Sequence, residues 1–538
     1  MSEEEFKQAS LDYHRQAPFG KIKVSATKPM VTQRDLALAY SPGVAYACEA
    51  IVADPSQAST LTARANLVAV VTNGTAVLGL GNIGPLAGKP VMEGKGVLFQ
   101  KFAGIDVFDI EIDENDPDKL VDIIASMEPT FGGINLEDIK APECFEVERK
   151  LRERMKIPVF HDDQHGTAII VGAAVINALH VAGKNIAEVK LATSGAGAAG
   201  IACLDMLVAL GLKPENILAL DRDGVLYEGR AHLDADKARY ARRTDKRSLA
   251  EIVDGADIFL GLSAGGVLKP EMVATMAARP IIFALANPYP EILPDDAKAV
   301  RPDAIIGTGR SDYPNQINNA LCFPYIFRGA LDVGATCINE DMKRACVYAI
   351  AELARKEASD LGTAYSGDTP KFGDQYLIPR PFDPRLLISL APAVAEAAIL
   401  SGVATRDMPD IALYRDQLSQ FVYRTGLLMK PMFERARADI KRVVYAEGEE
   451  ETVLRAVQTV VDEGLARPIL IGRPAVIERR IEKLGLRLKQ GVDFDLTNLD
   501  DDPRFNDYWQ HYLQIMERKG VSPSGGKALA RSRGRVVA

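Results

Sequence analysis

The sequence has few of the features on which several protein classes depend. Its 538 residues include six cysteines, and no two of them form a C-x-x-C pair. This argues against a zinc knuckle, a dithiol redox motif and a disulfide framework, so we expect reduced cysteines in the core. An excess of basic residues is also missing, because 64 Lys and Arg stand against 73 Asp and Glu. The formal net charge of −9 disfavours a nucleic-acid partner and fits a metabolic protein.

Long uninterrupted apolar runs are missing too. Polar residues or proline interrupt both of the longest apolar stretches, 386–404 and 167–183, so neither predicts a membrane span. The first residues, Met1–Glu5, are acidic where a signal peptide would be basic and then apolar. We therefore expect a cytoplasmic protein without a membrane partner.

The composition is that of a globular protein, with 47% hydrophobic and 25% charged residues. Strand-like and helical segments alternate from residue 97 to about 310, which is typical of parallel β-α-β layers and a doubly wound sheet. A fresh strand-helix-strand pattern occupies 441–472. We predict an α/β protein of three domains, with bounds 1–162, 163–425 and 426–538.

Three local patterns give more specific expectations. The segment LVAVVTNGTAVLGL, rich in Val and Thr around Asn73-Gly74, predicts a hairpin of two antiparallel strands. The segment VLFQKFAG (97–104) predicts another strand. The final residues KALARSRGRVVA have no apolar pattern, and we expect them to be frayed.

A glycine motif marks the predicted second domain. The pattern G-x-G-x-x-G follows the strand-like VKLATS and opens a helix, and its residues are Gly195, Ala196, Gly197, Ala198, Ala199 and Gly200. Such a loop lets a pyrophosphate approach the backbone at the positive end of a helix. The alternative is that the glycines only allow close helix–strand packing.

Asp221, about 20 residues further on, would hold the adenosine ribose hydroxyls of NAD. Arg222 beside it could instead meet the 2′-phosphate of NADP, with further basic residues at Arg242, Arg243 and Lys246. Those three basic residues could equally form a solvated helix face. The choice between NAD and NADP stays open at this point.

Three carboxylates follow two strand-like runs. Glu137 and Asp138 end INLED, and Asp163 ends PVFHDD. The ends of parallel strands face one crevice, and hard carboxylate oxygens suit Mg²⁺ or Mn²⁺ rather than Zn²⁺. The alternative is that they are ordinary polar loop residues.

Four other side chains could contribute to chemistry. His161 and His165 lack the glutamate of an H-E-x-x-H motif, so we expect structural or supporting roles. Lys95 is flanked by glycines in an apolar run, where desolvation or a nearby cation could lower its pKa enough for it to act as a base. Tyr40 lies at a turn and could be an acid. A solvated lysine and a packing tyrosine are the alternatives.

Taken together, these motifs resemble the malic enzymes in order and spacing over about residues 20–425. The segments that carry the resemblance are LAYSPGVA, TNGTAVLGLGNIG, VMEGKGVLFQKFAGID, INLEDI, FHDDQHGTA, SGAGAAG, ALANPYPE and GRSDYPNQINN. The resemblance implies the following roles: proton donor, Tyr40; general base, Lys95; metal ligands, Glu137, Asp138 and Asp163; dinucleotide loop, Gly195–Ala198; cofactor contact, Asn287; substrate contact, Asn319.

The same resemblance implies an N-terminal substrate and metal domain, a Rossmann-type NAD(P) domain, and a homo-oligomer. The implied reaction is oxidative decarboxylation of (S)-malate to pyruvate and CO₂, with Mg²⁺ or Mn²⁺ and with NADP⁺ slightly favoured over NAD⁺. From about residue 430, RVVYAEGEEETVLRAV and ARPILIG resemble the start of the phosphate acetyltransferase module of the bacterial hybrid malic enzymes. Because the resemblance covers only part of that module, we expect a regulatory or structural role and at most weak acetyl-CoA binding.

Two other functions would use only part of these features. A metal-independent dehydrogenase would keep the glycine loop but would not need the three carboxylates, and its activity would survive chelation. A phosphate acetyltransferase or an acetyl-CoA-binding regulator would depend on the C-terminal module, and the former would form acetyl phosphate from acetyl-CoA.

Overall fold

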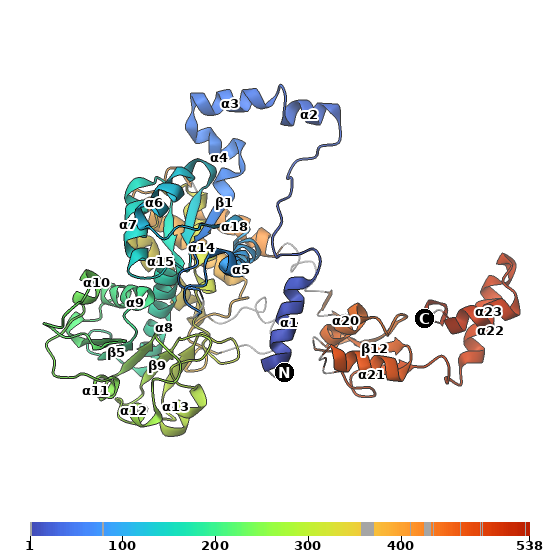
Figure 1. Ribbon diagram of the computed structural model, residues 1–538. Helices are drawn as coiled ribbons and strands as arrows, with labels where there is room; N and C mark the ends of the chain where they lie inside the picture. Colours follow the sequence, from blue (N-terminus) through green and yellow to red (C-terminus); the bar gives the residue numbers. More distant parts are fainter. Residues whose placement is uncertain are drawn as a thin grey trace. The chain divides into compact units, whose positions relative to one another are not determined.

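The computed structural model describes residues 3–77, 80–356, 371–408, 410–423 and 432–537, without 434, 463, 485, 487 and 533. The chain forms two compact units (Figure 1). The larger unit is His14–Val422, and the smaller unit combines Met1–Tyr13 with Tyr423–Ala538. The boundary predicted between residues 425 and 426 lies outside the described residues.

The first sheet of the larger unit has four parallel strands in the order β2-β1-β3-β4. They are β1 (Leu67–Thr72), β2 (Asp106–Glu111), β3 (Gly133–Leu136) and β4 (Val159–His161). The connecting helices are α5 (Pro85–Ala103), α6 (Pro117–Ser126) and α7 (Glu143–Arg154). Every residue of β1 is buried, as expected of a parallel strand covered on both faces.

The predicted hairpin is wrong. β1 pairs in parallel with β2 and β3, and the Asn73-Gly74 turn leads into α5 instead of a second strand. Gly74 has φ +68°, and a Cβ there would lie 2.3 Å from the carbonyl oxygen of Gly84, so the glycine serves a tight strand-to-helix connection. The strand predicted at 97–104 is also wrong, because residues 97–103 lie in α5, which buries Lys95, Phe99 and Ala103 at helical spacing.

The second sheet has six strands in the order β10-β9-β8-β5-β6-β7, all parallel except β7. They are β5 (Leu191–Ser194), β6 (Ile217–Asp221), β7 (Gly224–Val225), β8 (Ile258–Gly261), β9 (Ile281–Ala284) and β10 (Ile305–Thr308). The strand order reverses between β5 and β8, the usual place for a dinucleotide in a doubly wound sheet. The predicted fold class is confirmed.

The helices around this sheet begin with the π-turn η4 (Asp162–Gly166), which continues directly into α8 (Thr167–Ala182). The predicted boundary between residues 162 and 163 falls inside this turn. The remaining helices are α9 (Ala198–Ala209), α10 (Ala235–Ala238), α11 (Leu249–Val253), α12 (Pro270–Ala274) and α13 (Pro294–Val300).

The end of the larger unit is helical and packs beside both sheets. Its elements are the short turn η6 (Asn319–Leu321), α14 (Phe323–Asp332), α15 (Glu340–Arg355), α17 (Arg385–Leu400) and α18 (Ile411–Tyr423). Helix α8 contacts α9 and α15. One hydrophobic core contains Val68 of β1, Leu191 of β5 and Phe323 of α14, so the two sheets share a core.

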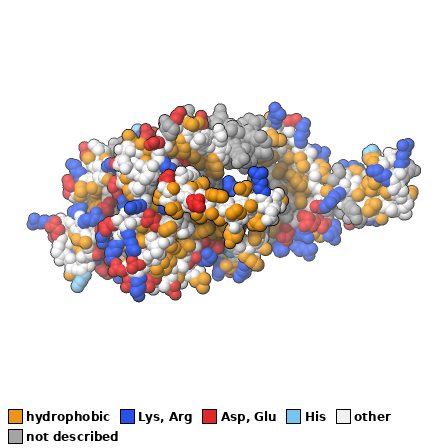
Figure 2. All heavy atoms as spheres, turned by 90° about the horizontal axis from the view of Figure 1, so that it is seen from above, with side chains coloured by type: hydrophobic (Ala, Val, Ile, Leu, Met, Phe, Trp, Pro, Cys, Tyr) orange, Lys and Arg blue, Asp and Glu red, His pale blue; other side chains and the backbone are white. Residues whose placement is uncertain are grey.

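The start of the larger unit is an exposed arm. It contains α2 (Gln33–Ala39), α3 (Val44–Ala53) and α4 (Ala58–Leu61), none of which buries a residue. Figure 1 shows α2 and α3 standing away from the first sheet, and Figure 2, which looks down on them, shows hydrophobic side chains across their surface. The exposed large apolar residues of the arm from residue 30 on are Met30, Val31, Leu36, Leu38, Tyr40, Val44, Tyr46, Val52 and Leu61.

Two helical stretches among the described residues are long and apolar enough, by length and composition alone, to span a membrane. They are Gln33–Ala53 in the exposed arm and Asp162–Ala182, which includes α8. The second is 67% buried inside the protein, as core helices often are. The prediction of no membrane partner stays a prediction.

The smaller unit has a parallel sheet of β11 (Lys441–Tyr445), β12 (Ala466–Ile471) and β13 (Asp495–Thr497). Its helices are α1 (Glu3–Arg15), which ends just beyond the unit's first segment, α20 (Glu451–Asp462), α21 (Pro474–Lys483), α22 (Phe505–Met516), α23 (Pro523–Ser532) and α24 (Gly534–Val537). The expectation of a frayed C-terminus is wrong, because α23 is helical and buries Ala530 completely.

All six cysteines are free thiols. Cys144, Cys203, Cys322 and Cys346 are buried as expected. Cys48 on the exposed arm is not, because nothing in its helix packs against a core.

Candidate active site

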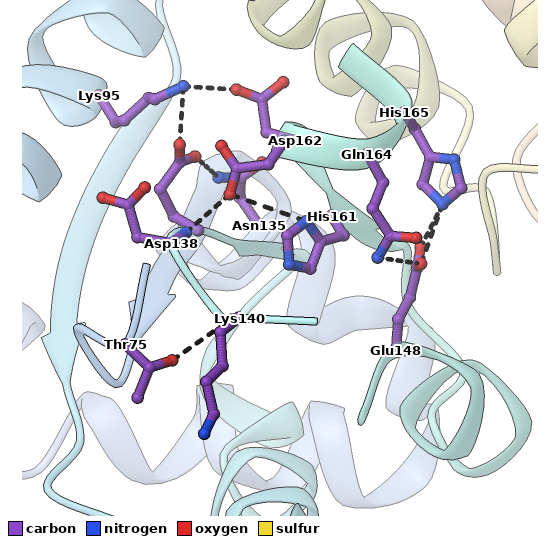
Figure 3. A network of polar contacts seen from close by, with 12 residues as sticks. Thr75, Lys95, Asn135, Asp138, Lys140, Glu148, His161, Asp162, Gln164 and His165 are labelled. Atoms are coloured by element: carbon purple, nitrogen blue, oxygen red, sulfur yellow. Dashed lines mark hydrogen bonds and ion pairs between the residues drawn. The ribbon is translucent and has the colours of Figure 1, made fainter. Parts of the chain in front are cut away.

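A buried lysine lies among carboxylates at the carboxyl edge of the first sheet (Figure 3). The Nζ atom of Lys95, from α5, is 2.5 Å from Oδ2 of Asp162 and 3.0 Å from Oε1 of Glu137. Asn135 donates to the other oxygen of Glu137 at 3.0 Å, which fixes that carboxylate. The three charged groups come from a helix and from the ends of two adjacent strands, so the parallel register brings them together.

Burial and the neighbouring charges shift the pKa values of Lys95 and Glu137 in this cluster. Burial alone would lower the pKa of Lys95, but attraction by Asp162 and Glu137 outweighs burial and raises it. Burial raises the pKa of Glu137 well above its usual range, and repulsion by Asp163 adds to this against the attraction of Lys95. The expectation of a lowered lysine pKa is therefore wrong for the protein without bound metal, because the nearest charges are anions.

The three predicted metal ligands do converge. Single oxygen atoms of Glu137, Asp138 and Asp163 all lie within 4.8 Å of one another. Asp163 Oδ2 also accepts the backbone N–H of Asp138 at 2.8 Å, and Asp138 has φ +54°, a conformation that aspartate tolerates better than most residues. Crowded carboxylates with two of three buried are a donor set that fits a hard divalent cation.

The turn η4 carries both Asp162 and Asp163. Gly166 is required at its end, because a Cβ there would lie 1.9 Å from Oδ1 of Asp162 and 3.1 Å from Cβ of Asn319. The same close approach places Asn319, at the start of η6, beside this turn. The predicted substrate contact thus lies next to the lysine and carboxylate cluster.

His161 and His165 contact different groups and do not converge on one metal position. His161 is fully buried, its Nδ1 is 3.9 Å from Oδ2 of Asp163, and burial lowers its pKa. His165 points the other way and contacts Glu148 (Figure 3). Among the described residues, the only group of three metal-binding side chains is the carboxylate cluster.

The glycine loop lies at the carboxyl end of β5, and each glycine has a distinct environment. A Cβ on Gly195 would lie 2.3 Å from the carbonyl oxygen of Leu262, and one on Gly200 would lie 2.0 Å from that of Gly195. A Cβ on Gly197 would meet nothing within 4 Å. Two glycines therefore serve tight packing, and the middle one leaves the backbone open to a ligand before α9.

Asp221 ends β6 beside this loop, since the N–H of Gly195 donates to the carbonyl of Leu220. Its carboxylate is already paired, 2.6 Å from Nη2 of Arg230 and 3.1 Å from Nζ of Lys237. Burial opposes ionisation of Asp221, yet these donors lower its pKa. Its neighbour Arg222 is 96% exposed.

The other predicted basic residues do not reach Asp221 in any described contact. Arg242 donates to the carbonyls of Pro214 and Arg239, and Lys246 donates to that of Glu251. Sequence reasoning missed Arg230 and Lys237, which are nine and 16 residues after Asp221.

Asn287 is exposed at the carboxyl end of β9. Its loop is tied to the loop after β8 by Glu291, a fully buried carboxylate that accepts the N–H groups of Ser263 and Ala286 at 2.8 and 3.0 Å. The predicted cofactor contact thus lies on the edge of the sheet that carries the glycine loop.

Tyr40 is the one predicted residue outside this arrangement. It caps α2 in the exposed arm, 69% of its surface is accessible, and no described interaction joins it to Lys95 or the carboxylates. Sequence reasoning also missed Asp162 and Glu148, although the doublet in FHDD offered a signal for Asp162.

Comparisons with known proteins agree with this arrangement. Residues 19–152 match the model "Malic enzyme, N-terminal domain", residues 164–366 match "Malic enzyme, NAD binding domain", and residues 427–535 match "Phosphate acetyl/butaryl transferase".

Similar proteins cover most of the chain. An NADP-dependent malic enzyme of Salmonella typhimurium is 64% identical over 97% of this chain and 69% of its own length. An NAD-dependent malic enzyme of Rhizobium meliloti is 61% identical over 98% and 69%. The crystal structure of a malic enzyme from Pyrococcus horikoshii superposes with a TM-score of 0.71 at 41% identity, covering 80% of this chain and 99% of that one. With its two sheets, its lysine and carboxylate cluster and these relatives, the chain belongs to the malic enzyme family.

Proposed function

We propose that the chain catalyses the oxidative decarboxylation of (S)-malate to pyruvate and CO₂ with reduction of NADP⁺, or of NAD⁺ at lower efficiency, in the presence of Mg²⁺ or Mn²⁺. The observation that carries this proposal is the buried contact of Lys95 with Asp162 and Glu137, beside the converging carboxylates. The open Gly197 of the dinucleotide loop supports the redox half of the reaction. The names of the relatives, most of them NADP-dependent malic enzymes, support the substrate and cofactor.

Glu137, Asp138 and Asp163 are the residues that would hold the divalent cation. When bound, it would supply Lewis acidity for the negative charge that develops on the substrate oxygens. It would also offset the anions that now hold Lys95 in its ammonium form.

The chain's own residues then have separate tasks. Lys95 Nζ accepts the proton of the C2 hydroxyl as a hydride leaves C2 for the nicotinamide. Asn319 binds the substrate beside η4, and Asn287 contacts the cofactor at the edge of the second sheet. When the C3–C4 bond breaks, C4 leaves as CO₂ and its bonding electrons remain on the enolate of the product. The Tyr40 hydroxyl then donates a proton to C3.

The position of Tyr40 supports a homo-oligomer. Its arm exposes a row of apolar side chains in α2 and α3, which is costly for an isolated chain. Because the arm helices bury no residue against their own unit, a second copy of the chain is what covers their apolar side chains. In this arrangement Tyr40 of one copy enters the Lys95 site of the other. An isologous pair completes both sites in this way.

Mixing two inactive variants tests this arrangement. We expect Tyr40→Phe and Lys95→Ala to be nearly inactive alone, and unfolding and refolding them together to restore about a quarter of the wild-type activity, because half of random dimers carry one intact site. No recovery in dimers shown by size exclusion to have mixed would contradict exchange of Tyr40.

Removal of residues 427–538 tests the role of the smaller unit. We expect most malate oxidation to survive, because every proposed site residue lies in the larger unit, at or before Asn319. Steady-state kinetics with and without acetyl-CoA should also show little inhibition of the intact chain. Loss of activity in a folded deletion variant, or strong acetyl-CoA inhibition of the intact chain, would refute this division.

The proposed reaction itself is tested by parallel assays of the intact chain with malate, Mn²⁺ and either NADP⁺ or NAD⁺. We expect a higher kcat/KM with NADP⁺, equimolar pyruvate and reduced cofactor, and loss of activity after chelation. Activity that survives exhaustive chelation would favour a metal-independent dehydrogenase.

A further inference from the structure

The turn η4 presents side chains to two different sites. On one side, Asp162 contacts Lys95, and Asp163 belongs to the carboxylate cluster. On the other side, the next two residues, Gln164 and His165, both contact the carboxylate of Glu148 (Figure 3). Glu148 therefore holds the turn from the side opposite the carboxylate cluster. In no described contact does Glu148 touch a proposed metal ligand.

Glu148 is well placed to hold the turn. It lies on α7, is 5% exposed, and accepts from Nε2 of His165 at 2.7 and 2.9 Å and from Nε2 of Gln164 at 3.3 Å. Burial opposes its ionisation, but its contacts with His165 outweigh burial and lower the pKa of Glu148. A buried anion with two donors from consecutive residues fixes both the position and the direction of that segment.

His165 is held at its other nitrogen as well. Its Nδ1 lies 3.3 Å from Nζ of Lys343, a buried lysine of α15 that also pairs with Glu340 at 2.5 Å. The contacts assign the Nε2 proton to the bond with Glu148 and leave Nδ1 to accept from Lys343. Contacts from two helices, α7 and α15, therefore fix the position of the His165 imidazole.

The turn η4 depends on contacts from other elements because it is not part of a regular α-helix. It is a single π-turn, a feature that often marks functional sites, and Thr167 N–H reaches back to the carbonyl of Asp162. Gly166 contributes no side chain, and the space its Cβ would fill is taken by Asp162. Regular α-helical structure begins only at Thr167, the first residue of α8.

We propose that Glu148 is a positioning residue for the metal site, which holds η4 through Gln164 and His165 so that Asp163 stays in the carboxylate cluster and Asp162 stays against Lys95. This inference rests on the proposed function for the identity of the site. A residue that only stabilised the fold would change the melting temperature and the binding of all ligands together. A residue that positions η4 changes metal binding and leaves the dinucleotide loop, on another strand, unaffected.

The experiment compares Glu148→Gln and Glu148→Asp with Glu146→Gln in the full-length protein. Glu146 lies on the same helix but is exposed and pairs with Lys150, so it is a matched control. Free Mn²⁺ is titrated by electron paramagnetic resonance without substrate, NADPH binding is measured by its fluorescence, and Tm is recorded for each variant.

We expect Glu148→Gln to weaken Mn²⁺ binding about 10–100-fold, with NADPH binding within about twofold of wild type. The Mn²⁺ affinity of Glu148→Asp should lie between those of Glu148→Gln and wild type, and that of Glu146→Gln should match wild type. The positioning role of Glu148 is overturned if Glu148→Gln leaves the Mn²⁺ affinity unchanged. It is also overturned if both Glu148 variants lose Mn²⁺ and NADPH binding in parallel. Neither result would affect the proposed function. A wild-type chain that binds no Mn²⁺ would remove the proposed metal site, and this inference with it.

Discussion

Replacing Lys95 with alanine is expected to lower kcat for malate oxidation by about 10²–10⁴-fold, the range for loss of a general base. In the proposed mechanism the lysine acts on the C2 hydroxyl proton, and its helix α5 contributes no residue to the glycine loop. NADP⁺ binding should therefore stay near the wild-type value. Single-turnover kinetics at saturating Mn²⁺ and malate would measure the chemical step directly.

Two further variants separate the proton-transfer role from the charge of Lys95. Lys95→Arg keeps a cation between Asp162 and Glu137 but offers no base at neutral pH, so it should remain slow while restoring Tm. Lys101→Ala, at an exposed position of the same helix, should behave as wild type. A near-normal kcat in Lys95→Ala would refute the assignment.

Replacing Asp163 with alanine should raise the Mn²⁺ concentration needed for half-maximal activity by at least about tenfold, or abolish activity, since it removes an anionic ligand. NADPH binding should persist, because the glycine loop lies on the other sheet. Titrating Mn²⁺ into chelator-treated enzyme gives the result.

The control for this change is Asp122→Ala, an exposed carboxylate on α6 outside the site. Glu137→Gln and Asp138→Asn should resemble Asp163→Ala if the three oxygens share one cation. Mn²⁺ dependence unchanged from wild type in a folded Asp163→Ala protein would show that the cluster is not the metal site.

The parts of the site that follow strand ends could be predicted from the sequence. Glu137 comes directly after β3, and Asp163 is the second residue after β4. Parallel strands present their carboxyl ends at one edge, so the convergence of the two side chains followed from the pattern. The glycine loop was predictable for the same reason, since its spacing occurs between a strand and a helix.

Features that depend on tertiary contacts could not be predicted. Val and Thr around Asn73-Gly74 suit a hairpin as well as a buried parallel strand, and only pairing with distant β2 and β3 decides between them. The pKa of Lys95 depends on which charges face it, and Asp162 proved to be the nearest. The pairing of Asp221 with Arg230 likewise arises from a loop that returns to the strand end.

The turn η4 has one more consequence, which concerns the mechanics of the larger unit. It is the covalent link between the two sheets, because it follows the last strand of the first and begins α8, which leads to β5 of the second. A rotation of one sheet against the other that bends the chain at this link therefore moves the segment that carries Asp163. We expect a cation bound at the carboxylate cluster to restrain this link, so cation binding should slow amide hydrogen exchange at the start of α8 as well as at the site itself.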